Sequence, residues 1–286
     1  MNNEFYIGWL PKAPGGFAKH IKKVLLALLP VMIIVGITLA LLQKKFDTGN
    51  FEFGKLTEVK GIYFNKPVPM IKVVNGKDIW GNISYLGIPL VGYGKHGAEG
   101  IMMELEKEKN ISLTQKEITL KGTLIYNDGK TIMQVNEDDN PLVHVADSKA
   151  ANELLQQQKD LGVSKVKGEI IDPKCYFGVM KPGEGKVHRD CAIRCILGGI
   201  PPMMKVRNEK GENNYYLVVG PNGENMNNAV QDYVGEPVEI EANLVQYDDW
   251  IVMYVKSDKL ISRISTLALL RNETAIISCT MGNCNK

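Results

Sequence analysis

The chain has 286 residues, with 34 lysines and arginines against 32 aspartates and glutamates, and its formal net charge at pH 7 is +2. This balance gives no broad basic surface, so the composition excludes a protein that binds nucleic acid through its overall charge. The length suits one large or two small domains, and the frequent glycine, proline and alternating apolar residues favour a mainly β fold.

The first predicted element is an uncharged apolar run from Val24 to Leu42. Its length is sufficient for a helix to cross the hydrocarbon core of a membrane, where an internal proline such as Pro30 is tolerated. A cleaved signal peptide and a buried core helix are the alternatives, but the run is longer than the usual hydrophobic region of a signal peptide. We predict a retained transmembrane helix over residues 24–43, preceded by a cytoplasmic segment of residues 1–23.

Lysines on the two sides of this run indicate its orientation. Four lysines lie within residues 12–23, whereas Lys44 and Lys45 follow the run directly. Because basic residues favour the cytoplasmic side, we predict a single-pass inner-membrane protein with its amino terminus in the cytoplasm and its bulk in the periplasm. Cysteines in that compartment meet oxidising conditions.

Beyond the apolar run the sequence repeats itself. Three blocks recur in the same order: EVKG and KVKG, PMIKV and PMMKV, and finally GTLIYNDGKTIMQV and ANLVQYDDWIVMYV. The last block reads as a β-hairpin, with its turn at Asn127-Asp128-Gly129 in one copy and at Asp248-Asp249 in the other. Three matching blocks in one order indicate a duplicated domain.

Each copy reads as three strands, a short helical piece near residues 100–109 or 226–234, and a final hairpin. This order in about a hundred residues suits a small closed barrel of the oligonucleotide/oligosaccharide-binding (OB) type, and a split sandwich is the alternative. We therefore predict a mainly β protein with one N-terminal transmembrane helix and two duplicated OB-like small β-barrel domains. The predicted bounds are a first barrel at 44–146, a helical linker at 147–162, a second barrel at 163–258 and a C-terminal tail at 259–286.

The two copies differ at one connection. Pro69 follows Gly61 after eight positions, whereas Pro202 follows Gly168 after 34, so the second copy carries 26 additional residues within 169–201. Long loops with special residues are usually functional or separately stabilised. A barrel needs no such excursion, so we expect the core of the second barrel to form without this insertion.

The insertion holds one histidine and three cysteines: Cys175, His188, Cys191 and Cys195. The segment HRDCAIRCILGG reads as a short helix on which the last three of these residues share one face, because they are three and four positions apart. Cys175, at a strand end, completes a set of three sulfurs and one imidazole that suits zinc or copper. We predict these four residues as metal ligands and expect no other cofactor. The preceding KPGEGK, residues 181–186, is expected to be a flexible loop.

Two other uses of the cysteines remain open. A disulfide from Cys175 to Cys191 or to Cys195 would suit an oxidising compartment. A redox-active pair of Cys191 and Cys195 would make the protein a thiol-disulfide or metal-dependent oxidoreductase. Outside the insertion, Cys279 and Cys284 are expected to pair with each other in the tail.

The insertion also carries a resemblance to a known group of proteins. The pattern V-x-G-x-I-x-D-x-x-C-Y, then H-x-x-C-A-x-x-C, then G-x-P, runs from Val166 to Pro201. It resembles a group of exported bacterial domains, and the opening FYIGWLPKAP with the apolar run resembles membrane-anchored members of that group. The resemblance implies an envelope location and a functional cysteine and histidine cluster, but it supplies no reaction.

The sequence shows no spacing of serine, histidine and aspartate that suggests a hydrolase triad. We therefore expect an accessory or assembly protein with protein partners in an envelope complex, such as a respiratory one, and without nucleic acid. An oxidoreductase using Cys191 and Cys195 is one alternative, and a purely structural scaffold is the other.

Overall fold

The computed structural model describes residues 12–43, 49–77, 81, 83–137, 140–148, 158–208 and 210–270. The chain divides into two units, Met1–Phe46 and Asp47–Lys286. The first is a helical unit and the second contains all of the described strands, so the protein is mainly β, as predicted.

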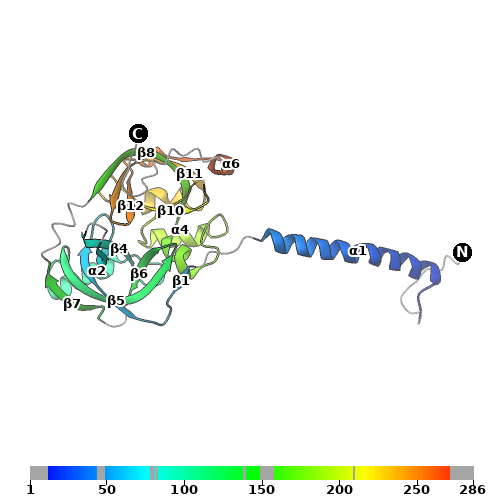
Figure 1. The fold of residues 1–286 in the computed structure, drawn as a ribbon, viewed down its shortest axis with the longest axis horizontal. Helices are drawn as coiled ribbons and strands as arrows, with labels where there is room; N and C mark the ends of the chain where they lie inside the picture. The colour runs from blue at the N-terminus through cyan, green and yellow to red at the C-terminus, as the bar shows by residue number, and fades with distance from the viewer. Residues whose placement is uncertain are drawn as a thin grey trace. The chain divides into compact units, whose positions relative to one another are not determined.

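The described part of the first unit is built around helix α1 (Gly15–Leu42; Figure 1). It begins nine residues before the apolar run because no breaker separates the two segments. Its 28 residues give a length of about 42 Å, which exceeds the hydrocarbon core of about 30 Å. Among the described residues it is the single helix long and apolar enough to cross a membrane, and a signal sequence near the amino terminus would meet the same criteria.

The first barrel has five strands and one helix, in the predicted order. They are β2 (Thr57–Phe64), β3 (Met70–Lys77), β4 (Ile83–Val91), α2 (Glu99–Lys109), β5 (Lys116–Asn127) and β6 (Lys130–Val135). Strand β6 pairs antiparallel with β5 and parallel with β4, which closes the barrel. Two further strands, β1 (Asn50–Phe51) and β7 (Leu142–Asp147), pair with β5.

The second barrel repeats this order. It contains β8 (Lys159–Ile171), β9 (Met203–Arg207), β10 (Asn213–Val219), α5 (Asn227–Val230), the 3-10 helix η2 (Gln231–Tyr233), β11 (Pro237–Tyr247) and β12 (Trp250–Tyr254). Strand β12 closes it by pairing parallel with β10. The chain continues through η3 (Asp258–Leu260), β13 (Ile261–Arg263) and α6 (Thr266–Leu270). Because β13 pairs with β11, the start of the predicted tail at 259–286 belongs to the second barrel.

The strand registers of the two barrels agree at the seam that closes each barrel. At the parallel seam of the first barrel Leu90 pairs with Met133, and at the seam of the second Val218 pairs with Met253. In the repeated sequence blocks, Met133 and Met253 are the same position. Equal registers at the closing seam are what a duplicated barrel requires, and the predicted architecture is confirmed.

The repeated glycines have the same structural role in both barrels. A Cβ atom on Gly61 would lie 2.5 Å from the carbonyl oxygen of Lys72, and one on Gly168 would lie 2.3 Å from that of Lys205. Only glycine permits so close an approach of neighbouring backbones. The glycine shared by EVKG and KVKG is therefore required in each barrel because the neighbouring strand leaves no space for a side chain.

The predicted helical linker at 147–162 is wrong at both ends. Asp147 ends β7, and residues 159–162 begin β8. Lys159 and Asp160 pair with the far end of β11, and this tertiary pairing overrides their weak local strand preference. Residues 149–157 of the predicted linker lie outside the described residues.

Each barrel docks the tip of its final hairpin on the other barrel. The backbone N–H of Gly87 in β4 donates to Asp249 Oδ1 at 2.7 Å, and Trp250 Nε1 donates to the Gly87 carbonyl at 2.8 Å. In the other direction, the Tyr215 hydroxyl in β10 donates to Asp128 Oδ2 at 2.6 Å. Gly87 and Tyr215 occupy the same position in the two barrels, so the contact is pseudo-two-fold.

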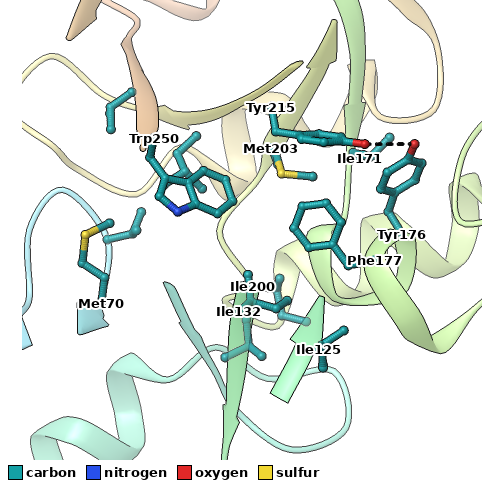
Figure 2. Close-up of a cluster of buried hydrophobic side chains, with 14 of the residues drawn as sticks. Met70, Ile125, Ile132, Ile171, Tyr176, Phe177, Ile200, Met203, Tyr215 and Trp250 are labelled. Atoms are coloured by element: carbon teal, nitrogen blue, oxygen red, sulfur yellow. Dashed lines mark hydrogen bonds between the residues drawn. The ribbon is translucent and has the colours of Figure 1, made fainter. Parts of the chain in front are cut away.

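A shared core fills the space between the barrels (Figure 2). It takes side chains from both barrels and from the insertion, including Met70, Ile125, Ile132, Phe177, Ile200, Met203, Tyr215 and Trp250. The ring of Phe177 meets the ring of Tyr215 edge-on, with centroids 5.1 Å apart. Because Phe177 is fully buried here, the insertion is part of the core, and the expectation that the barrel forms without it is revised.

Candidate metal centre

Two short helices of the insertion position the predicted ligands. Strand β8 ends at Ile171, and the backbone N–H of Lys174 then donates to Asp172 Oδ1 at 2.8 Å, which turns the chain into the π-helix η1 (Cys175–Val179). Helix α4 (Arg189–Leu197) follows His188 and ends at Gly198. The short helix predicted from HRDCAIRCILGG is therefore confirmed.

The four predicted ligands come together. The ligand atoms of Cys175, His188 and Cys191 lie within 4.8 Å of one another, and so do those of Asp172, Cys175 and Cys195. The sulfurs of Cys175 and Cys195 are 4.0 Å apart. All three cysteines are free thiols, so the disulfide considered from Cys175 to Cys191 or Cys195 is not formed.

Two polar atoms in this cluster are buried without a partner. His188 is 4% exposed and its Nε2 makes no hydrogen bond, and Asp172 is 0% exposed with its Oδ2 unpaired. Buried polar atoms in proteins are nearly always hydrogen-bonded, so an unpaired one calls for an explanation. A metal ion bound with Cys175 and Cys191 would satisfy the imidazole of His188, which belongs to the same set of ligand atoms.

The environment favours the neutral forms of Cys175 and His188. Contact with Cys195, followed by burial and the nearby Asp172 carboxylate, raises the pKa of Cys175 far above its usual range. Burial lowers the pKa of His188, and the Asp172 charge opposes this only in part. At pH 7 Cys175 is therefore a thiol and His188 a neutral imidazole, the form that binds metals. A cation at the sulfurs would favour the thiolate.

The first barrel contributes a lysine that sequence reasoning missed. Lys95 Nζ donates to Cys191 Sγ at 3.3 Å, and this hydrogen bond is the main cause that raises the pKa of Lys95. The backbone N–H of Gly97 donates to the Gly198 carbonyl at 2.9 Å. A Cβ atom on Gly198 would lie 1.9 Å from the Lys95 carbonyl oxygen, so the loop and the end of α4 are in direct backbone contact.

A second missed lysine holds the same loop. The ammonium group of Lys174 is buried and donates to the carbonyls of Gly92 and Gly94 at 2.7 and 2.8 Å. Burial lowers the pKa of Lys174. No spacing along the chain links this loop with the insertion about 80 residues later. The glycine density of GYGKHGAEG was the available signal for a close backbone approach.

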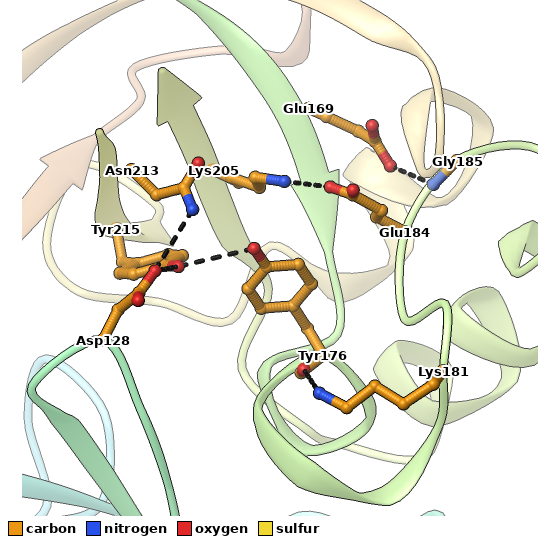
Figure 3. A network of polar contacts seen from close by, with 9 residues as sticks. All are labelled: Asp128, Glu169, Tyr176, Lys181, Glu184, Gly185, Lys205, Asn213 and Tyr215. Carbon is orange, nitrogen blue, oxygen red and sulfur yellow. Dashed lines mark hydrogen bonds and ion pairs between the residues drawn. The ribbon is translucent and has the colours of Figure 1, made fainter. Parts of the chain in front are cut away.

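The loop predicted to be flexible is tied to the second barrel (Figure 3). In KPGEGK, the N–H of Gly185 donates to Glu169 Oε1 at 2.5 Å, and Glu184 forms an ion pair with Lys205 of β9. Lys181 Nζ donates to the Tyr176 carbonyl at 3.3 Å. These contacts hold the segment between the two ligand-bearing helices in a defined path.

The remaining predicted cysteines, Cys279 and Cys284, lie outside the described residues. In comparisons with known proteins, no family model and no curated protein matches this sequence. The resemblance to exported bacterial domains therefore stays a prediction.

Proposed function

We propose that this protein is a membrane-anchored accessory or assembly protein whose barrel unit binds a zinc or copper ion. Cys175, His188 and Cys191 are its ligands, with Cys195 adjacent. The observation that carries the proposal is the unpaired imidazole nitrogen of His188, buried beside the thiols of Cys175 in η1 and Cys191 in α4. Mixed thiolate and imidazole sets are typical of zinc and copper sites.

An oxidoreductase using Cys191 and Cys195 is the second candidate. It is favoured by the position of Cys191, the one half-buried thiol among the three free cysteines, beside the Lys95 ammonium group. However, Cys195 makes its sulfur contact with the buried Cys175. A thiol that exchanges disulfides with a partner has to be accessible, so this geometry supports metal binding better.

The proposed location is the periplasmic face of the inner membrane, with α1 as a retained anchor. The lysines before the apolar run support this orientation, and the resemblance to exported domains supports the compartment. The accessory role within an envelope complex follows from the anchor, the metal-binding cluster and the lack of a recognisable hydrolase pattern in the sequence.

A fusion experiment tests the location. We expect alkaline phosphatase joined after Lys286 to be active and to remain in the membrane fraction, because that enzyme needs disulfides that form outside the cytoplasm. The same fusion without Gly15–Leu42 is the control and should be inactive. A soluble active product that starts near Leu41 would show a cleaved signal peptide. If only a reporter that works in the cytoplasm were active at this position, the predicted orientation would be wrong.

Metal analysis of matched histidine variants tests the function. We expect His188→Ala to lower metal content and thermal stability together, since metal binding at such a site contributes to folding free energy. His144→Ala, an exposed histidine of β7, is the control and should change stability by about 0.5 kcal/mol or less. Freshly purified parent protein without metal, together with a neutral His188→Ala, would contradict the proposal.

A further inference from the structure

Asp172 is a buried acid next to the cysteines, and only one of its two carboxylate oxygens has a hydrogen-bond partner. Asp172 Oδ1 accepts the hydrogen bond that starts η1, but Oδ2 has no partner although the residue is completely buried. A neutral asparagine would make the same turn. The second carboxylate oxygen therefore needs a different explanation, because a buried polar atom is costly unless it is hydrogen-bonded or binds a metal.

The donors fall into two sets of three rather than one set of four. Cys175 is the shared member: His188 and Cys191 lie on one side of it, and Asp172 and Cys195 on the other. With metal–sulfur bonds of about 2.3 Å, two thiolates on one tetrahedral ion lie roughly 3.8 Å apart. The 4.0 Å between the sulfurs of Cys175 and Cys195 is close to that value.

We propose that Asp172, Cys175 and Cys195 form a second metal position next to the first. The Cys175 thiolate then bridges two ions. This inference rests on the proposed function, because the first ion is the one bound by Cys175, His188 and Cys191. Each ion has three protein donors, and this leaves a coordination place for water or for a group from a partner.

Charge and burial support this arrangement. Asp172, Cys175 and Cys195 are all buried, and a cation bound between them would favour the thiolate forms of the two cysteines and attract the carboxylate. The ammonium group of Lys174 interacts electrostatically with Asp172, Cys175 and Cys195, but its hydrogen bonds go to the carbonyls of Gly92 and Gly94, so Asp172 Oδ2 still has no hydrogen-bond partner. The second set also explains the unpaired Oδ2, which the Cys3His set leaves without a partner.

Anaerobic titration of the metal-free full chain in detergent with cobalt(II), followed by elemental analysis, tests the proposal. The parent should bind two ions per chain with thiolate-to-cobalt absorption. Asp172→Asn keeps the turn and should reduce the number of bound cobalt ions to one per chain, because it removes a ligand of the second position. His188→Ala should also reduce the number to one, because it removes a ligand of the first position. Cys175→Ser should bind neither ion. If Asp172→Asn does not fold, as judged by circular dichroism, Cys195→Ser makes the same prediction of one ion.

The possible outcomes separate the two proposals. One ion in the parent, unchanged by Asp172→Asn or Cys195→Ser, would overturn the second position and leave the proposed function intact. Absence of any bound cobalt, zinc or copper in the parent would overturn both. Two ions that persist in Asp172→Asn with unchanged affinity would show that this carboxylate is not a ligand and would also overturn the assignment.

Discussion

Replacing residues 174–199 with a short polar turn like residues 65–69 is expected to abolish cooperative folding of the two-barrel unit. Helix α4 contributes Ala192 and Ile196 to the core of the second barrel, and η1 places Phe177 between the barrels. Truncating one large buried side chain costs about 3–5 kcal/mol, and a domain has only about 5–15 kcal/mol of stability. Removing several such side chains at once exceeds that reserve.

Circular dichroism during denaturation by urea measures this effect. The parent should unfold in one cooperative transition and the shortened protein should show none. Val187→Ser, which changes an 83% exposed side chain of the insertion, is the matched control and should unfold at the midpoint of the parent. A shortened protein that unfolds cooperatively near that midpoint would show that the barrel core forms without the insertion.

Trp250→Ala is expected to destabilise the same unit by about 3–5 kcal/mol. The indole is fully buried in the core between the barrels, and its Nε1 donates to the Gly87 carbonyl across the interface. Trp250→Phe keeps most of the apolar contact and loses the hydrogen bond, so it should cost less than Trp250→Ala. The difference between the two variants measures packing at the hairpin tip.

Urea denaturation followed by circular dichroism and by aromatic fluorescence measures this effect. Phe53→Ala, which truncates an 81% exposed aromatic ring, is the control. We expect a lower midpoint for Trp250→Ala with one shared transition, because the barrels share a core. Unchanged stability, or barrels that unfold separately in the parent, would contradict the role given to this contact.

Local sequence patterns predicted the two barrels and the part of the metal site that lies on helix α4. The turns at Asn127-Asp128-Gly129 and Asp248-Asp249 identified the hairpins, since the strand–turn–strand signal is contained in about fourteen residues. The spacing of His188, Cys191 and Cys195 placed them on one helix face for the same reason. Both features depend on neighbours in the sequence.

Features that depend on distant segments were missed. Lys95 reaches Cys191 from the other barrel, and no periodicity encodes a contact between residues so far apart. Asp172 belonged to the recognised pattern, but its burial beside the thiols is a tertiary property. We interpreted the insertion as a loop outside the core because its centre, KPGEGK, is rich in glycine and proline. Its apolar residues, such as Phe177, instead pack between the barrels.

The reciprocal docking of the hairpin tips has a consequence for the origin of the protein. Lys130 and Trp250 are the same position of the two repeats, and the Lys130 ammonium group lies 5.0 Å from the centre of the Trp250 ring. A residue that touches its own counterpart lies on the axis of a two-fold assembly. The unit thus has the geometry of a homodimer joined into one polypeptide. In a dimer of identical chains every change appears twice, whereas fusion allows one half to specialise in chemistry and the other to remain its support.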